Sequence, residues 1–274
     1  MAARDPHRYV NELDEASIER LIARLESRAK DQVFTRLFDK YASRIVAQSP
    51  ARVLEVGSGT GSMLRALARR PDFRGVAVGV EQSPAFVEAA RRLAREEGVG
   101  DRVTFEVGDA HKLELPDASF DAVIINTVIS HVSDARAVLG ELARVVRKGG
   151  TVAIFDGDYA SMTYAYPDFA LGRRMDWALV TATFNNPSIM RELPALLPRY
   201  GLRITEAWGD AVAEIGKASF FKSFAETYVP YVINAGLEPA EVVQRWHAVQ
   251  QEAMEKGTFF GACNYYTYLA QRVA

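Results

Sequence analysis

Residues 55–61 read EVGSGTG, and this glycine-rich stretch decides the fold. The apolar residues Val53 and Leu54 directly before it predict a strand, and Met63 and Leu64 after it indicate the start of a helix. Glycines in this place permit a sharp turn and a close approach of the backbone to a ligand. The N–H groups at the start of the helix can then meet an anionic group. The stretch therefore predicts a strand–loop–helix unit that binds a ligand at its turn.

The spacing of these glycines favours one class of ligand over another. A dinucleotide-binding fold usually carries G-x-G-x-x-G, which forms a pyrophosphate site. Here the loop is G-x-G-x-G, and an acid, Glu55, lies two residues before its first glycine. The pattern suits a ligand with a carboxylate and a cation better than a ligand with a diphosphate. It also disfavours an NAD-linked oxidoreductase, whose catalytic Tyr-x-x-x-Lys the sequence lacks.

Short apolar runs alternate with amphipathic runs through the middle of the chain. We expect helices there at about 62–70, 84–97 and 134–147, between strands at 52–56, 76–80, 103–107, 122–126 and 151–155. Strand, helix and strand at this spacing predict right-handed crossovers and a parallel sheet. Further strands are predicted near 202–208 and 259–272.

Polar residues follow the second, third and fourth of these strands. Glu81 ends the second strand, and a carboxylate there can accept hydrogen bonds from both hydroxyls of a ribose. Asp109, after the third strand, either accepts from an exocyclic amine such as that of adenine or is an ordinary turn residue. Asn126 and Thr127 are polar where the fourth strand emerges, and they either contact the ligand or cap the next helix. Because the carboxyl ends of parallel strands share one edge of the sheet, these side chains predict a ligand crevice at that edge.

Taken together, these motifs resemble those of the class I S-adenosylmethionine-dependent methyltransferases. Their order along the chain is the order of the family, and residues 131–150 look like the branch that includes ubiquinone/menaquinone-biosynthesis methyltransferases and many natural-product enzymes. The resemblance covers about residues 50–156. It implies an α/β fold, a Rossmann-like three-layer sandwich with a seven-stranded, mostly parallel sheet whose last strand is antiparallel. Residues 258–273 are the candidate for that last strand.

The resemblance also implies where the cofactor S-adenosyl-L-methionine would bind, with S-adenosyl-L-homocysteine as its product. The glycine loop would face the methionine part, Glu81 would hold the ribose, and Gln82 would lie beside the adenine. Asp109 and Ala110 would contact the adenine edge, Asn126 and Thr127 would lie near the sulfonium, and Arg28 would pair with the methionine carboxylate. The cofactor-binding candidates are therefore Arg28, Glu55, Gly57, Ser58, Gly59, Gly61, Glu81, Gln82, Asp109, Ala110, Asn126 and Thr127.

His131 is the catalytic candidate. Methyl transfer needs a general base only where the acceptor holds its proton firmly. His131 follows the tip of the fourth strand, and an imidazole titrates near neutral pH, although helix capping or core packing is the alternative role. Asp156 or Asp158, after the fifth strand, either orients the substrate or belongs to a plain polar loop. Metal-dependent catechol-type methyltransferases keep an acid where this chain has Asn126, so the sequence predicts no metal.

The chain divides into a predicted core and two additions. Residues 1–49 predict an N-terminal helical cap, residues 50–208 and 259–274 the S-adenosylmethionine-binding core, and residues 209–258 a helical lid insertion. Aromatic residues between Phe220 and Tyr231 recur at helical spacing in this insertion. They either pack in the core or form an apolar wall for an aromatic or lipid-like acceptor.

Charge and length restrict the partners. The 274 residues carry 33 Lys and Arg against 35 Asp and Glu, and the net charge of −2 gives no broad attraction to nucleic acid. No apolar run reaches the roughly 18 residues that a membrane span needs, and the first nine residues lack the apolar stretch of a signal peptide. The sequence therefore predicts a cytoplasmic protein with a small-molecule substrate, no nucleic-acid partner and no membrane span. Its oligomeric state stays open, with a homodimer among the options.

Missing motifs narrow the methyl acceptor. The [DN]-P-P-[FY] tetrapeptide of methyltransferases that act on amino groups of nucleic acid or glutamine is absent, because Thr127 follows Asn126. The single cysteine, Cys263, excludes an internal disulfide, a Pro-Cys nucleophile of the cytosine-C5 type and the several thiols of arsenite methylation. These absences favour a small organic acceptor.

Two functions follow from the resemblance. The first is an S-adenosylmethionine-dependent methyltransferase that methylates oxygen, nitrogen or carbon of a small organic molecule by in-line transfer. The second keeps the S-adenosylmethionine-binding scaffold without methyl transfer, either for a cyclisation or rearrangement or for regulatory binding. The absence of an obvious general base motivates the second hypothesis.

Overall fold

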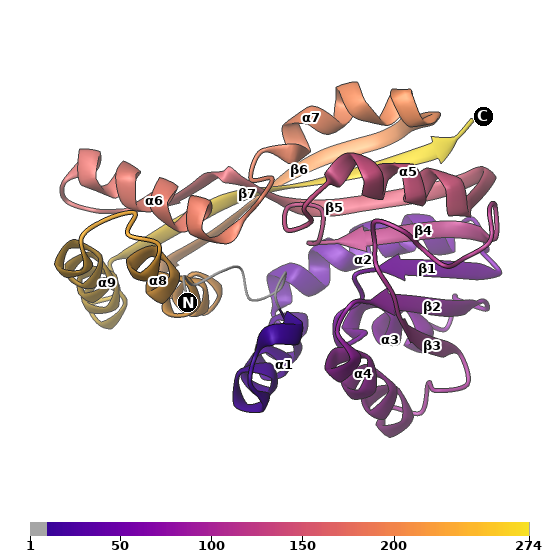
Figure 1. Cartoon of the computed structure of the whole chain (residues 1–274), viewed down its shortest axis with the longest axis horizontal. Coiled ribbons are helices and arrows are strands. Elements are labelled where there is room, and N and C mark those ends of the chain that lie inside the picture. The colour runs from indigo at the N-terminus through magenta and orange to yellow at the C-terminus, as the bar shows by residue number, and fades with distance from the viewer. Residues whose placement is uncertain (1–9, 274) are drawn as a thin grey trace.

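The apolar runs predicted as strands pair into one sheet. In the computed structural model, which describes residues 10–273, seven strands are hydrogen-bonded in the order β3-β2-β1-β4-β5-β7-β6 (Figure 1). The strands are β1 (Arg52–Val56), β2 (Val76–Glu81), β3 (Val103–Val107), β4 (Phe120–Asn126), β5 (Val146–Tyr164), β6 (Leu202–Gly216) and β7 (Phe259–Arg272). The first five strands run parallel, and β7 runs antiparallel to both β5 and β6. The predicted α/β class, with a mostly parallel sheet and an antiparallel last strand, is confirmed.

Helices cover both faces of the sheet and complete the predicted three-layer sandwich. Successive side chains of a strand point to opposite faces, so buried Val53 packs in the cluster with α2 and α3, and buried Leu54 packs in the cluster with α5 and α7. The helices are α1 (Glu15–Ala29), α2 (Gln32–Val46), α3 (Ser62–Arg69), α4 (Pro84–Glu96), α5 (Ala135–Val145), α6 (Phe169–Thr183), α7 (Ile189–Leu196), α8 (Phe220–Asn234) and α9 (Ala240–Glu255). Short 3₁₀ turns lie at Val10–Glu12 and Leu197–Tyr200. Within residues 10–273, no helix is both long and apolar enough to pass through a bilayer.

Three strands are much longer than a parallel core requires. The predicted strand at 151–155 is part of β5, which runs over Val146–Tyr164, and the strand predicted at 202–208 continues as β6 to Gly216. Both extensions pair with β7. This pairing provides hydrogen-bond partners for the backbone N–H and C=O groups of residues whose local sequence resembles a loop. Residues 209–216, which fall in the predicted helical insertion, are therefore strand.

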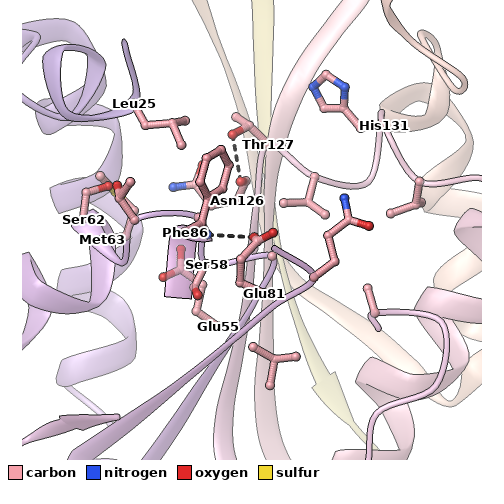
Figure 2. Close-up of a pocket in the computed structure, with 18 of the residues that line it drawn as sticks. Leu25, Glu55, Ser58, Ser62, Met63, Glu81, Phe86, Asn126, Thr127 and His131 are labelled. Carbon is pink, nitrogen blue, oxygen red and sulfur yellow. Dashed lines mark hydrogen bonds between the residues drawn. The ribbon is translucent and has the colours of Figure 1, made fainter. Parts of the chain in front are cut away.

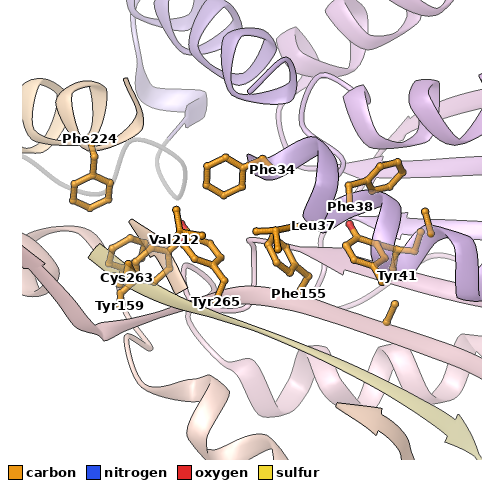
Figure 3. Packing of buried hydrophobic residues seen from close by; sticks show 14 of the residues in the cluster. Phe34, Leu37, Phe38, Tyr41, Phe155, Tyr159, Val212, Phe224, Cys263 and Tyr265 are labelled. Atoms are coloured by element: carbon orange, nitrogen blue, oxygen red, sulfur yellow. The ribbon is translucent and has the colours of Figure 1, made fainter. Parts of the chain in front are cut away.

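A second group of helices gathers around the far ends of β5, β6 and β7 (Figure 1). It consists of α8 and α9 from the predicted insertion and of α6, which packs against both of them. Aromatic side chains join this group to the rest of the core, and Phe155, Tyr265 and Tyr159 lie in a row toward Phe224 (Figure 3). The ring centroids of Phe155 and Tyr265 are 5.5 Å apart, and those of Tyr159 and Tyr265 are 6.1 Å apart.

Candidate functional site

A cavity of about 670 Å³ lies at the carboxyl ends of the parallel strands (Figure 2). Strand ends supply Glu55, Glu81 and Asn126 to its wall, and the N-terminal helices α1 and α2 cover it with apolar and aromatic side chains. The predicted crevice is therefore present as a cavity that is partly open to solvent. The N-terminal helices contribute Leu25, Arg28, Ala29, Phe34, Phe38 and Tyr41.

Nearly every residue that the sequence singled out reaches this cavity. Its lining includes the cofactor-binding candidates Arg28, Glu55, Gly57, Ser58, Gly59, Glu81, Gln82, Asp109, Ala110, Asn126 and Thr127, together with His131. Gly61 is the exception, because it does not belong to the lining. It is the N-cap of α3 with φ 73°, and an added Cβ would lie 2.3 Å from the ring of Phe105. Its glycine is needed to begin the helix rather than to face the cavity.

The glycine loop needs glycine for backbone reasons. Gly57 and Gly59 have φ values of 72° and 53°, in the left-handed region that side chains disfavour. A Cβ on Gly57 would lie 2.4 Å from Cγ2 of Val128, and one on Gly59 would lie 3.3 Å from Cδ1 of Leu25. The loop backbone therefore packs closely against Val128 and Leu25. Because Gly57 and Gly59 have no side chains, their backbone atoms line the cavity directly.

Glu81 ties this loop to the end of β2. Its Oε2 accepts a hydrogen bond from the backbone N–H of Gly59 at 3.0 Å (Figure 2). Its Oε1 accepts one from the N–H of Ser83 at 3.0 Å. Burial raises the pKa of this carboxyl, against the effect of those backbone donors. Each carboxylate oxygen has a second acceptor position, so Glu81 can still accept from a ligand.

Three buried polar atoms on the cavity wall have no hydrogen-bond partner among residues 10–273: the hydroxyl of Tyr41, Oε2 of Glu55 and Oγ of Ser58. Burial, together with the charge of Glu81, raises the pKa of Glu55 to about 8. Buried polar groups in folded proteins are normally paired, so this set indicates a polar ligand that supplies the missing partners. A cation beside Glu55 would also favour its charged form.

Thr127 is strained at the end of β4. Its φ is 54°, which is costly for a β-branched residue and typical of functional sites. Its N–H donates to the carbonyl of Phe155 at 2.7 Å, and its Oγ1 accepts from Nη1 of Arg28 at 3.3 Å. The strained turn therefore holds the Arg28 guanidinium at the cavity. Arg28 has no carboxylate within 4.0 Å among the residues that the structure describes.

Asp109 lies on the cavity wall with its carboxylate already engaged. One oxygen, Oδ1, accepts from the backbone N–H of His111 at 2.9 Å and lies 2.6 Å from Nδ1 of the same residue. Although partial burial opposes it, these contacts with His111 hold the pKa of Asp109 below its ordinary value. Both interpretations of Asp109 fit this geometry, because a turn residue on the wall can also contact a ligand.

His131 lies on the Thr127 side of the cavity, away from Glu55 and Ser58 in the view of Figure 2. Its ring is 4.9 Å from that of Phe184. Asp156 is fully buried nearby and accepts from the N–H groups of Ser130 and Gly157 at 3.0 and 2.8 Å. Burial raises the pKa of Asp156, and the proximity of His131 opposes that rise.

A second, much smaller cavity of about 30 Å³ shares Leu25, Arg28 and His131 with the first. We call it the aromatic chamber. Its remaining lining residues are Arg24, Tyr159, Phe184, Phe220, Phe224 and Tyr228.

The contact of Glu26 with the glycine loop could not be predicted from the sequence. Glu26 of α1 accepts from Oγ1 of Thr60 at 2.6 Å and from Nη2 of Arg65 at 2.6 Å. Arg65 is only 2% exposed and also pairs with Glu97. This contact fixes α1 over the glycine loop. An exposed-looking acid in an amphipathic helix cannot be told from its neighbours by pattern alone.

Within residues 10–273, no group of three or more His, Cys, Asp and Glu side chains is arranged to hold a metal ion. The sequence-based expectation of a metal-free site stays a prediction.

Comparison with known proteins gives one family. Residues 54–154 match the family described as methyltransferase domain. The chain is 31% identical over 224 residues to an uncharacterized 37.1 kDa protein in transposon TN4556 of Streptomyces fradiae, across 80% of this chain and 61% of that protein. It is 36% identical over 131 residues to 27-O-demethylrifamycin SV methyltransferase of Amycolatopsis mediterranei, across 48% of this chain and 47% of the relative. The chain thus spans less than two thirds of the length of either relative.

A solved structure shares the fold. The [4+2]-cyclase SpnF aligns with a TM-score of 0.56 at 24% identity, over 86% of this chain and 80% of that one. This likeness is one of fold alone. The matched family, the strand order and the acidic glycine loop at the strand ends agree, and residues 54–154 form a domain of the class I S-adenosylmethionine-dependent methyltransferase family.

Proposed function

We propose that this protein transfers the methyl group of S-adenosyl-L-methionine to a small organic molecule. The observation that carries the proposal is the set of unpartnered buried atoms, the Tyr41 hydroxyl, Glu55 Oε2 and Ser58 Oγ, in a cavity of about 670 Å³. The ammonium, carboxylate and hydroxyl groups of the cofactor are suitable partners for such atoms. The residues present therefore fit the cofactor that the family uses.

The proposed contacts follow the cavity wall. Glu55 and the glycine loop take the methionine part, Glu81 the ribose, and Gln82, Asp109 and Ala110 the adenine. Asn126 and Thr127 border the sulfonium side, and Arg28 pairs with the methionine carboxylate. Support for the role of Arg28 is its position on the wall without an acidic partner among residues 10–273.

The chain's own contribution to the reaction is positioning and exclusion of water. When bound, the cofactor would supply an activated methyl group for in-line transfer to an acceptor atom, with S-adenosyl-L-homocysteine as the other product. α1 and α2 cover the cavity and limit access of water, and the strained turn at Thr127 fixes one wall of the reaction space. We propose His131 as the residue that accepts a proton from an acceptor that must lose one. Asp156 beside it would stabilise the resulting imidazolium.

Two measurements test the proposal. Calorimetry should detect S-adenosyl-L-homocysteine binding, and incubation with S-adenosyl-L-methionine and a panel of small metabolites should give a product one CH₂ heavier. Absence of any cofactor binding would refute the proposal. Binding with consumption of an acceptor but no turnover of the cofactor would favour the alternative scaffold function.

We also propose that the acceptor is a small molecule and not a nucleic acid, which the net charge of −2 supports. In this scheme residues 1–49, of which 10–49 are described, act as the cap, and residues 209–258, of which 209–216 belong to β6, act as the lid of a core formed by residues 50–208 and 259–274, the last of which lies outside the described residues. The contact of Glu26 with Thr60, and the position of Tyr228 in the aromatic chamber, are in keeping with these roles.

Glu26→Gln should weaken S-adenosyl-L-homocysteine binding about three- to tenfold, because α1 is then held less firmly over the glycine loop. Loss of one of the two charged partners of buried Arg65 should also destabilise the fold by about 1–3 kcal/mol, or roughly 2–4 °C in Tm for each kcal/mol. Calorimetry and thermal unfolding measure the two effects. Glu19→Gln, on the exposed side of the same helix, is the matched control and should change neither quantity. Equal affinities for the two variants would show that Glu26 does not position α1 for binding.

A further inference from the structure

The aromatic chamber adjoins the proposed cofactor cavity on the side where methyl transfer would occur. Leu25, Arg28 and His131 line both spaces. The chamber's other walls come from distant parts of the chain: Tyr159 from β5, Phe184 just after α6, and Phe224 and Tyr228 from α8. An acceptor that approaches the sulfonium from this side would meet those rings first.

The rings present flat faces in nearly parallel planes. Tyr159 and Phe184 are stacked with centroids 3.6 Å apart and planes 12° apart, and Phe184 and Phe224 are 6.0 Å apart with planes 17° apart. All three side chains are buried. Centroids 3.6 Å apart leave no room for a ligand between Tyr159 and Phe184, so a flat unsaturated ligand can stack only on a ring face that these contacts leave uncovered.

Arg24 gives the chamber a positive charge. It lies one helical turn before Arg28 on the same face of α1, and it lines the aromatic chamber but not the larger cavity. Its Nη1 donates to the hydroxyl of Tyr228 at 3.2 Å, and its guanidinium lies 5.0 Å from the centre of that ring. Among residues 10–273, Arg24 has no carboxylate within 4.0 Å. Glu26, the acid between the two arginines in the sequence, accepts hydrogen bonds from Thr60 and Arg65 instead.

The half-buried guanidinium of Arg24 donates to a neutral hydroxyl. A hydrogen bond to an anion in place of that hydroxyl would be stronger. Hydrogen bonds between guanidinium and an oxyanion are charge-assisted and roughly twice as strong as neutral ones. The Arg24–Tyr228 bond also joins α1 to α8, across the two sides of the chamber. At about 30 Å³ the chamber has room for about one water molecule, so entry of a ring requires these two helices to separate.

We propose that the methyl acceptor is a flat, unsaturated ring compound that carries an oxyanion, with its ring in the aromatic chamber and its oxyanion on Arg24. This inference rests on the proposed methyltransferase function and adds the chemical class of the acceptor. Arg28 remains with the cofactor carboxylate, and Arg24 replaces its bond to Tyr228 by one to the acceptor. The separation of α1 from α8 is then coupled to recognition of the anion.

The test compares probes that differ in one feature. Binding of 2-naphthoate, 2-naphthyl phosphate, neutral 2-naphthamide and the non-aromatic anion cyclohexanecarboxylate is measured by calorimetry on the full chain saturated with S-adenosyl-L-homocysteine. We expect at least one aromatic oxyanion to bind at least tenfold more tightly than both the amide and cyclohexanecarboxylate. The ratio between the naphthoate and the phosphate shows which oxyanion the site prefers.

Variants assign the effect to Arg24. Arg24→Gln should remove the preference for the aromatic oxyanion over the amide and leave S-adenosyl-L-homocysteine affinity within about twofold, because Arg24 does not line the cofactor cavity. Arg24→Lys should keep part of the preference, since the charge remains. Arg20→Gln, an exposed arginine one turn earlier on α1 that bonds only to Ser17 among the described residues, is the matched control and should behave like the parent.

The failures are distinguishable. If S-adenosyl-L-homocysteine binds but no aromatic oxyanion binds more tightly than the amide, the inference about the acceptor is wrong and the methyltransferase proposal stands. An oxyanion preference that survives in Arg24→Gln also overturns the inference. If S-adenosyl-L-homocysteine itself does not bind, the proposed function fails first.

Discussion

Gly57→Val should weaken S-adenosyl-L-homocysteine binding at least about 100-fold, which corresponds to a loss of about 2.7 kcal/mol. Gly57 has φ 72°, and a Cβ there would lie 2.4 Å from Cγ2 and 2.8 Å from Cγ1 of Val128. Either the loop or Val128 must therefore shift, and both line the cavity, so the shape of its wall changes. A ligand that contacts this backbone closely loses both its space and its hydrogen-bond geometry.

Gly98→Val is the control, and it distinguishes the effect of backbone strain on stability from the loss of ligand binding. Gly98 has φ 69°, but an added Cβ meets no atom within 4 Å, and the residue lies outside the cavity. Gly98→Val therefore carries a comparable backbone strain of about 1–2 kcal/mol without blocking ligand binding. We expect a modest fall in Tm for each variant, of a few degrees by the usual relation of about 2–4 °C per kcal/mol. Only Gly57→Val should lose affinity. A Gly57→Val protein that folds and binds within threefold of the parent would mean that the loop does not form the cofactor site.

This loop also shows why the central part of the fold could be predicted. The glycine spacing, the buried strand before it and the acids at the next strand ends are local patterns, each readable within about ten residues. Their meeting at one sheet edge follows from parallel strand geometry. Glu55, Glu81 and Asn126 therefore line one cavity, as the sequence predicts.

The parts that sequence could not predict depend on distant contacts. The sequence places Asp156 and Asp158 after the fifth strand, where one of them either orients the substrate or belongs to a polar loop, yet both residues belong to β5. There Asp156 accepts from backbone N–H groups, and Asp158 pairs with Arg191 at 2.9 Å. The length of β5 is set by its pairing with β7, about 100 residues later in the chain. The local sequence of β5 contains no pattern from which its pairing with β7 could be predicted.

The apolar side of the cavity is a second example. Phe34 and Phe38 recur at helical spacing, which predicts only that they are buried. They line the cavity because α2 lies across the strand ends. The same holds for Tyr159 and Phe184 in the aromatic chamber, which β5 and the segment after α6 bring into contact. Periodicity identifies a buried face but cannot distinguish a core from a ligand wall.

Cofactor affinity should rise with pH between about 6 and 8, by up to about tenfold per pH unit, and then become constant. The cause is Glu55, whose pKa burial raises to about 8, with a further contribution from the charge of Glu81. A cationic ligand beside this carboxyl favours its charged form and lowers its pKa. Below pH 8, S-adenosyl-L-methionine binding must then release a proton, so protons compete with the ligand. Calorimetry in two buffers of different ionisation enthalpy measures the proton released.

The stability of the ligand-free protein should change with pH in the opposite direction. The pKa of Glu55 is higher in the folded chain than the value of 4.5 expected for an exposed glutamate, so the folded protein holds a proton that the unfolded chain has lost. Between pH 4.5 and about 8 the free energy of unfolding therefore falls as pH rises. Thermal unfolding over this pH range should show that the contribution of Glu55 to the free energy of unfolding declines as pH rises.

Glu55→Gln distinguishes this origin from the titration of the ligand's own ammonium group. The neutral amide cannot ionise, so the variant should lose the part of both slopes that Glu55 supplies and should bind S-adenosyl-L-methionine more weakly at pH 8. Glu106→Gln, an exposed acid on β3, should keep both slopes. Unchanged proton release in Glu55→Gln would assign the titration to another group and would remove Glu55 from contact with the cation. Loss of both slopes together would place the cofactor's positive charge at the buried carboxyl, because one proton on one side chain then links folding and binding.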